Sequence, residues 1–194
     1  MYTLPTEINI NEDVLHIRKR GDFRVILDCF SALQDIELEN EYRIAVATFI
    51  FYEDFETMQD VYNYQYLEQA VKEMFNFFVC NEKIDANKQD KSKLIDWDED
   101  AQLIVSAINK VAGKEIRAEE YIHWWTFMSY YNAVGTSVLS TVVSIRKKIV
   151  DGKKLEKHEQ EFKKENPQYF ARDFRSLEQQ QLDAQFRELW NQNK

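Results

Sequence analysis

Residues 96–100, Asp-Trp-Asp-Glu-Asp, carry carboxylates at a density that could supply the oxygen ligands of a calcium ion. An EF-hand calcium loop also requires glycine at its sixth position and an acidic residue at its twelfth. Ala101 and Ala107 occupy those positions, so the calcium hypothesis fails. The cluster is instead typical of a helix start. We expect Asp96 to cap the helix and the acidic residues after it to stabilise the positive end of the helix dipole.

Histidine and cysteine give no sign of a catalytic or metal centre. His16, His123 and His158 are scattered and have no cysteine or histidine at the spacing of a zinc site. Cys29 and Cys80 lie in apolar patterns and are expected to be buried thiols of a reducing compartment. The sequence contains no G-x-S-x-G turn and no glycine-rich phosphate-binding motif. We therefore expect no catalytic residue, no cofactor and no bound metal, hence a non-enzymatic protein.

The net charge of −9 argues against nucleic acid as a partner, because binding to the phosphate backbone needs clustered positive charge. Acidic residues are densest between positions 35 and 60, where Arg43 is the only basic residue. This acidic face is either an ordinary solvated helix surface or a binding surface for a basic partner. Its candidate residues are Asp35, Glu37, Glu39, Glu41, Glu53, Asp54 and Glu56.

The sequence also predicts where the protein is found. It has no uninterrupted apolar run of about 18 residues, the length of a membrane-spanning helix, so we expect no membrane contact. The first residues contain acids and lack the apolar core of a signal peptide. We therefore expect the protein in the cytoplasm of the cell that makes it.

Aromatic residues are densest in the segment 121–131, which has helical character. Consecutive helical residues point about 100° apart, so Trp124 and Trp125 cannot share one contact. Either this helix is buried on most sides, or part of it binds a partner, because aromatic residues dominate interface hot spots. The amphipathic stretch after residue 166 either folds back on its own domain or enters a groove on another chain. The candidate partner-binding residues are Trp124, Trp125, Phe127, Tyr130, Tyr131, Phe174, Phe186, Leu189 and Trp190.

Four glycines and two prolines in 194 residues favour long helices over a turn-rich β-sandwich. Residues 1–20 alternate like a small β-hairpin, and apolar residues then recur at helical spacing. We predict a mainly α protein of six to seven helices: a helical domain over 1–165, with an exposed linker at 81–93, and an amphipathic C-terminal helix over 166–194. The expected helices are 23–33, 40–51, 58–78, 97–112, 118–134, 138–149 and the stretch after Pro167, with Asp22, Asn40, Asp96 and Ser137 as N-caps and Gly113 as a C-terminal stop.

Several of these segments together resemble a known phage family. The acidic-aromatic segment 96–101, the block His123-Trp124-Trp125-x-Phe127 and the pair Ile145-Arg146 are similar to the siphophage family named after gene product fifteen. The hairpin that leads into Asp22-Phe23-Arg24 is similar as well, so the resemblance covers roughly residues 1–170. It implies a tail-module protein, encoded near the tail-tube and tape-measure proteins, and it implies no catalytic residues.

The resemblance further implies a tail assembly chaperone or accessory factor. Its partner would be a helical client such as the tape-measure or tail-tube protein, and the surplus of aromatic faces is compatible with self-association. Two other functions stay open. One is a structural component retained in the virion tail, and the other is an acidic protein that binds a host factor through the face between residues 35 and 60.

Overall fold

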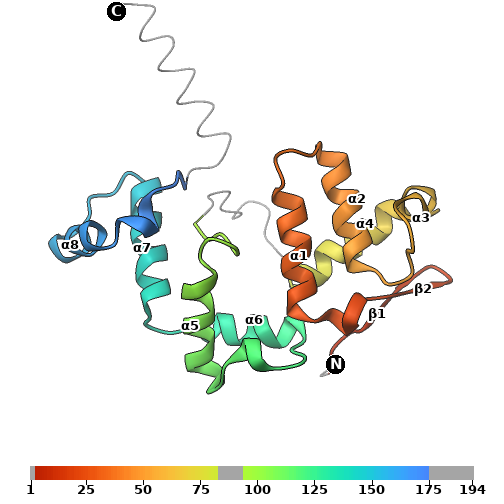
Figure 1. Ribbon diagram of the computed structural model, residues 1–194, viewed down its shortest axis with the longest axis horizontal. Helices are drawn as coiled ribbons and strands as arrows, with labels where there is room; N and C mark the ends of the chain where they lie inside the picture. The colour runs from red at the N-terminus through yellow and green to blue at the C-terminus, as the bar shows by residue number, and fades with distance from the viewer. Residues whose placement is uncertain (1–2, 83–93, 175–194) are drawn as a thin grey trace, which may run out of the picture. The chain divides into compact units, whose positions relative to one another are not determined.

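The computed structural model describes residues 3–82 and 94–174 (Figure 1). In these ranges the chain is mainly helical, with eight α-helices and a two-stranded antiparallel sheet near the N-terminus. This confirms the predicted fold class. The chain divides into two compact units. The first comprises residues 3–82 and 108–134, and the second comprises residues 94–107 and 135–174.

The predicted hairpin consists of β1 (Glu7–Ile10) and β2 (Asp13–His16), which pair antiparallel. Asn11 turns the chain between the two strands with a φ of 54°, a conformation that asparagine adopts more readily than most residues. Ile10 and Leu15 are buried. The hairpin is therefore part of the packed first unit, which is what so short a sheet needs for stability.

The rest of the first unit is built from α1 (Phe23–Gln34), α2 (Asn40–Phe51), α3 (Met58–Asn63), α4 (Leu67–Phe78) and α6 (Trp124–Asn132). Helices α1 and α2 lie side by side (Figure 1). The core between these elements is strongly aromatic. Its buried rings include Phe23, Phe51, Tyr52, Phe77, Phe78, Trp124 and Phe127.

The starts of α1 and α2 test two of the predicted N-caps. Asp22 caps α1 as predicted, because its carboxylate accepts a hydrogen bond from the backbone N–H of Arg24 at 3.0 Å. Asn40 is the first residue of α2 rather than its cap. Glu39 holds the cap position, and its side chain makes no capping hydrogen bond. The prediction for Asn40 was therefore wrong by one residue.

The single helix predicted over 58–78 is interrupted between α3 and α4. The chain leaves the helical conformation at Tyr64, with φ −66° and ψ 123°. Its ring packs edge-to-face on Phe55 at 5.5 Å, and its hydroxyl donates to Asp13 at 3.3 Å. These tertiary contacts override the apolar periodicity, which continues through the break.

Helix α6 begins at Trp124, six residues later than the predicted start at 118. A short 3-10 helix, Ile116–Ala118, precedes it. The intervening backbone is bound by side chains of α1 and its cap: Arg24 donates to the Glu119 carbonyl at 2.7 Å, and Asp22 accepts the N–H of Ile122 at 3.0 Å. These side chains bind a backbone carbonyl and a backbone N–H that would otherwise pair within a longer helix, so α6 begins after them.

Just before α1, residues Arg18–Gly21 form a left-handed turn. Lys19 and Arg20 have φ of 46° and 56°, and Gly21 has a φ of 76°. A left-handed conformation costs about 1–2 kcal/mol for each residue with a side chain. The turn is held because the Arg18 guanidinium donates to three backbone carbonyls at the end of α2, at 2.7–3.0 Å.

The second unit contains the start of α5 (Ala101–Ala112), with α7 (Val138–Val150), α8 (Lys157–Glu165) and a 3-10 helix, Pro167–Phe170. Ser137 caps α7 as predicted, in a reciprocal capping box with Ser140. Gly113 follows α5 with a φ of 69°, and its N–H donates to the Asn109 carbonyl, as expected of a helix stop.

Three features of the second unit differ from the predictions. Residues 97–100 form a turn, and α5 begins only at Ala101. Helix α8 was missed because its sequence is almost entirely polar. The predicted boundary at residue 166 does not separate residues 166–174 from this unit, while the rest of the predicted terminal helix and most of the predicted linker lie outside the described residues. Within the described ranges, none of the helices combines the length and the apolar character that crossing a membrane requires.

Candidate functional site

The acidic segment 96–100 and the arginine of α7 meet inside the second unit. Arg146 and Asp100 are only 2% and 3% exposed. The guanidinium Nη1 lies 2.6 Å from Oδ2 of the carboxylate, and Nη2 lies 2.9 Å from Oδ1. Two parallel hydrogen bonds of this kind are the strongest arrangement of an arginine with a carboxylate. Asp100 was expected to stabilise a helix dipole, whereas in the structure its carboxylate pairs with the buried guanidinium of Arg146.

The sequence does contain a signal for this pair. Arg146 stands four residues after the buried Val142 of α7, and Asp100 stands four residues before the buried Ile104 of α5. Residues four apart lie on the same side of a helix. A charged residue in register with buried apolar ones is usually paired, so the spacing marks each position as a candidate for a buried ion pair without identifying its partner.

Arg146 also holds two other chain segments. Its Nε and Nη2 donate to the carbonyl oxygen of Tyr169 at 2.9 and 2.7 Å, and Nη1 donates to the carbonyl of Leu94 at 2.8 Å. Together with Asp100, these acceptors use all five N–H donors of the guanidinium. One side chain thus joins the 94–100 segment, α7 and the 3-10 helix that follows α8.

Arg172 extends the cluster at the end of the described chain. Its guanidinium lies within 3.0–3.2 Å of carboxylate oxygens of Asp96, Glu99 and Asp100. The ring of Phe174 faces both arginines, with its centroid 4.6 Å from Arg146 and 5.2 Å from Arg172. Guanidinium groups bind aromatic faces in this way. Phe174 is buried by these contacts, so the structure corrects its assignment as a partner-binding residue.

The charges of this arginine–carboxylate cluster compensate one another. Burial opposes ionisation of the Asp100 carboxyl and is the largest single effect on it. The bonds and charge of Arg146, with the backbone of Asp96 and the charge of Arg172, together outweigh burial and lower the pKa of Asp100. In the part of the chain that the structure describes, no group of three or more His, Cys, Asp or Glu side chains could hold a metal ion. The cluster is a structural clamp.

In the first unit, Trp124 and Phe127 of α6 are core residues, each 1% exposed. The indole N–H of Trp124 donates to the carbonyl of Phe78 at 2.9 Å. The ring of Phe127 stacks on Phe23 at 4.7 Å and on Trp124 at 5.4 Å. The structure therefore corrects the assignment of Trp124 and Phe127 to a partner-binding surface, because covered side chains present no area to another chain.

The remaining predicted aromatic residues have different environments. Trp125 is half-buried, and its indole N–H donates to the carbonyl of Phe77 at 3.0 Å. Tyr130 and Tyr131 are partly exposed, and their role in binding a partner stays a prediction. Phe186, Leu189 and Trp190 lie outside the described residues.

His123 fixes the start of α6. Its Nδ1 accepts the backbone N–H of Trp125 at 3.0 Å, and its Nε2 lies 2.9 Å from the carbonyl oxygen of Pro5. Because Nδ1 accepts, the ring is neutral and carries its proton on Nε2. Gly21 lies against this ring, and a side chain there would bring its Cβ within 3.1 Å of Nε2. Burial lowers the pKa of His123, although the Pro5 carbonyl and the charge of Asp22 act in the opposite direction.

We expect the free energy of unfolding to decrease on acidification because of His123. The unfolded histidine takes up a proton near pH 6.5, whereas the folded one, with its lowered pKa, does so only at lower pH. Between these values only the unfolded state gains the proton, so the contribution of His123 is present above pH 6.5 and is lost as the pH falls. The measurement is the thermal unfolding midpoint against pH. His123→Asn, which can still cap a helix but does not titrate, should flatten the decrease.

His16 supplies a control of the opposite sign. The hydrogen bond and charge of Asp54 raise the pKa of His16, so this histidine stabilises the fold in acid. His16→Gln should therefore make the decrease on acidification steeper. Parallel profiles of the wild type and His123→Asn would show that His123 does not control the pH dependence.

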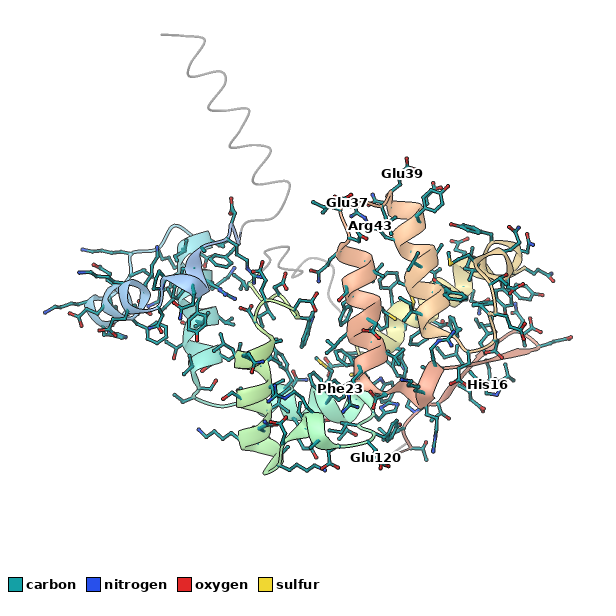
Figure 2. The ribbon with its side chains drawn as sticks, in the orientation of Figure 1. His16, Phe23, Glu37, Glu39, Arg43 and Glu120 are labelled. Atoms are coloured by element: carbon teal, nitrogen blue, oxygen red, sulfur yellow. The ribbon has the colours of Figure 1, made fainter. Side chains whose placement is uncertain are left out.

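The predicted acidic residues are all exposed, but they form two separate groups. Asp35, Glu37, Glu39 and Glu41 surround the α1–α2 connection, where Figure 2 shows Glu37 and Glu39. Glu53, Asp54 and Glu56 follow the other end of α2, a helix of 12 residues that spans about 18 Å. Glu53 accepts the N–H of Lys19, and Asp54 binds His16, so Glu53 and Asp54 serve internal contacts.

Sequence reasoning missed exposed apolar and tyrosine residues, two of which adjoin the first acidic group in the chain. Ile36 is 84% exposed, in the connection between α1 and α2. Tyr42 and Tyr62 are 53% and 45% exposed, and their rings meet edge-to-face at 6.5 Å. We call Ile36, Tyr42 and Tyr62, with Glu37 and Glu39, the corner surface. No periodicity marks a connection residue such as Ile36, so no sequence pattern pointed to it.

The fold and its two buried clusters define a small helical protein, with arginine and carboxylate side chains holding the second unit together internally and aromatic side chains filling the core of the first. The sequence matches the family described as "Bacteriophage Gp15 protein" over residues 2–170, and the chain belongs to this bacteriophage family. The matched range includes the 96–101 segment, the His123–Phe127 block and Ile145-Arg146, so the resemblance drawn from them is confirmed. No curated protein and no solved structure matches the chain.

Proposed function

We propose that this chain is a non-enzymatic tail-module protein, a tail assembly chaperone or accessory factor that acts in the cytoplasm of the bacterial host. It would bind a helical client such as the tape-measure or tail-tube protein. The observation that carries the proposal is the family match over residues 2–170 of 194. The buried groups support a non-enzymatic role: burial raises the pKa of the Cys29 thiol, and Arg146 has all its donors bound internally.

The corner surface is the part of the first unit best suited to a client. Large apolar and tyrosine side chains that stand out from a surface are typical binding anchors. Ile36 and Tyr42 adjoin carboxylates in the chain, and the guanidinium of Arg43 is bound to the carbonyl of Leu38 at 2.7 Å. An apolar anchor with an acidic margin fits an amphipathic helix that carries basic residues, and the charges would speed its association.

The test is a pull-down of the tagged protein from cells that express the tail module, with mass spectrometry of the bound proteins. Recovery of the tape-measure or tail-tube protein is the expected result. Recovery of a host protein alone would overturn the client assignment and favour a host factor on the acidic face. Detection of the protein in purified virions would favour a retained structural component instead.

The double variant Ile36→Asp, Tyr42→Ala should lower recovery of the client at least about tenfold, because loss of two anchor residues commonly costs more than about 1.4 kcal/mol. Both side chains are exposed, so the variant should unfold at the wild-type temperature. The matched control is Val138→Asp, which changes another half-exposed apolar residue and should leave recovery unchanged. Equal recovery by the double variant and the control would place the client elsewhere.

A further inference from the structure

A groove of about 450 Å³ lies in the second unit, between the end of α7, helix α8 and residues 170–174. Its apolar lining comes from Ile149 and Val150 of α7 and from Phe170 and Phe174. Ile149, Val150 and Phe170 are only half-buried. The volume falls within the range of sites that bind apolar ligands or side chains, roughly 300–1,000 Å³.

The chain itself continues from the wall of this groove. Phe174 is one of the lining residues, and it is fixed there by the guanidinium groups of Arg146 and Arg172. Residues 175–194 follow directly. Leu182 comes eight residues after Phe174, so at most about 29 Å of extended chain separates it from the groove. The arginine–carboxylate cluster thus holds the start of the following segment at the groove.

The sequence of 175–194 supplies a matching apolar side. Four of its five large apolar residues recur with the spacing of one helix face, and mostly polar residues fill the positions between them. An amphipathic helix that lays such a face in an apolar groove is a common recognition mode. The residues of this face are Leu182, Phe186, Leu189 and Trp190, whereas Leu177 falls on the opposite side of such a helix.

We propose that the groove lined by Ile149, Val150 and Phe170 binds the apolar face of the segment 175–194 of the same molecule. The short connection decides between this segment and one from a second copy. A short tether gives an effective concentration in the millimolar range, far above the concentration of free protein in solution. The groove is therefore a helix-binding site that its own chain occupies, and a foreign helix would have to displace the segment. This inference does not depend on the proposed function, because its test involves this chain alone.

The experiment is hydrogen exchange of the full chain, followed by mass spectrometry of peptides from 175–194. In the wild type their amides should exchange at least about tenfold more slowly than in Val150→Glu, which places a charge in the groove. Val138→Glu, on the exposed side of the same helix, should keep the protection. Phe186→Glu changes the apolar face of the segment rather than the groove and should give the same loss as Val150→Glu, while peptides of α7 stay protected.

Each other outcome overturns the proposal. Fast exchange of 175–194 in the wild type would show that the segment is not bound. Protection that survives both Val150→Glu and Phe186→Glu would place the segment on another surface. Protection that rises with protein concentration, together with a dimer in sedimentation, would assign the groove to the segment of a second copy.

Discussion

Asp100→Asn is expected to lower the free energy of unfolding of the second unit by about 3–5 kcal/mol, the usual cost of removing one partner from a buried ion pair. Asparagine keeps the shape of the side chain but removes its charge. The guanidinium of Arg146 would then stay 2% exposed without its counter-ion. The measurement is urea denaturation, with the far-ultraviolet circular dichroism analysed for two transitions, since two units can unfold separately.

The matched control is Asp151→Asn. Asp151 also pairs with cations, the side chains of Lys147 and Lys153, but those lysines are 43% and 67% exposed. Exposed pairs contribute about 0–1 kcal/mol, so the control should remain close to the wild type. Equal destabilisation by the two variants would show that the Asp100–Arg146 pair contributes no more than a surface pair.

The same variant has a pH signature. The pKa of Asp100 is below its ordinary value of 3.8, so the contribution of this carboxylate is present above pH 3.8 and is lost as the pH falls through the folded pKa. The difference in stability between the wild type and Asp100→Asn should therefore be full at neutral pH and shrink in strong acid. A difference that is constant with pH would exclude the charge as its cause.

Local chemistry in the sequence was enough to predict most of the fold. The hairpin, the Asp22 cap of α1, the Ser137 cap of α7 and the Gly113 stop each depend on residues close in the chain. The errors occur where distant contacts prevail. Tyr64 leaves the helix because its ring packs on Phe55, and α8 forms although its sequence has little apolar pattern.

Helix α8 shows why composition alone misled the prediction. A polar stretch is read as surface or linker because it cannot bury apolar area. Here Glu159 of α8 is buried, and both its oxygens bind the ammonium of Lys148 at 2.7–2.9 Å. An ion pair thus joins this helix to α7. Only the tertiary structure shows which of many charged residues make such a pair.

The sequence showed which residues make up the candidate sites, but not which of them are exposed. The sequence located the acidic segment 96–100 and the aromatic block of α6, and both are centres of the structure. It could not show that Arg146, 46 positions from Asp100, pairs with the acidic segment. Nor could it tell which rings of α6 face the core, because its aromatic residues occur on every side of the helix. The corner surface depends on exposure alone, which no sequence pattern reports.

Trp124→Ala should lower the free energy of unfolding of the first unit by about 3–5 kcal/mol, the range for removing a large aromatic side chain from a core. The indole is 1% exposed, stacks on Phe127 and meets the ring of Phe30 at 5.6 Å. Its removal leaves a cavity and also deprives the Phe78 carbonyl of a donor. Denaturation by urea, followed as above, measures the loss.

Two further variants separate core packing from partner binding at this helix. Trp124→Phe keeps a ring but loses the indole N–H, so it should cost less than alanine. Tyr42→Ala removes an aromatic side chain that is 53% exposed and should change stability by no more than about 0.5 kcal/mol. If Trp124→Ala were as stable as Tyr42→Ala, the buried position of Trp124 would be wrong. Because Trp124→Ala disrupts the core, its loss of client binding would report unfolding, whereas a loss in Tyr42→Ala at unchanged stability would report a contact.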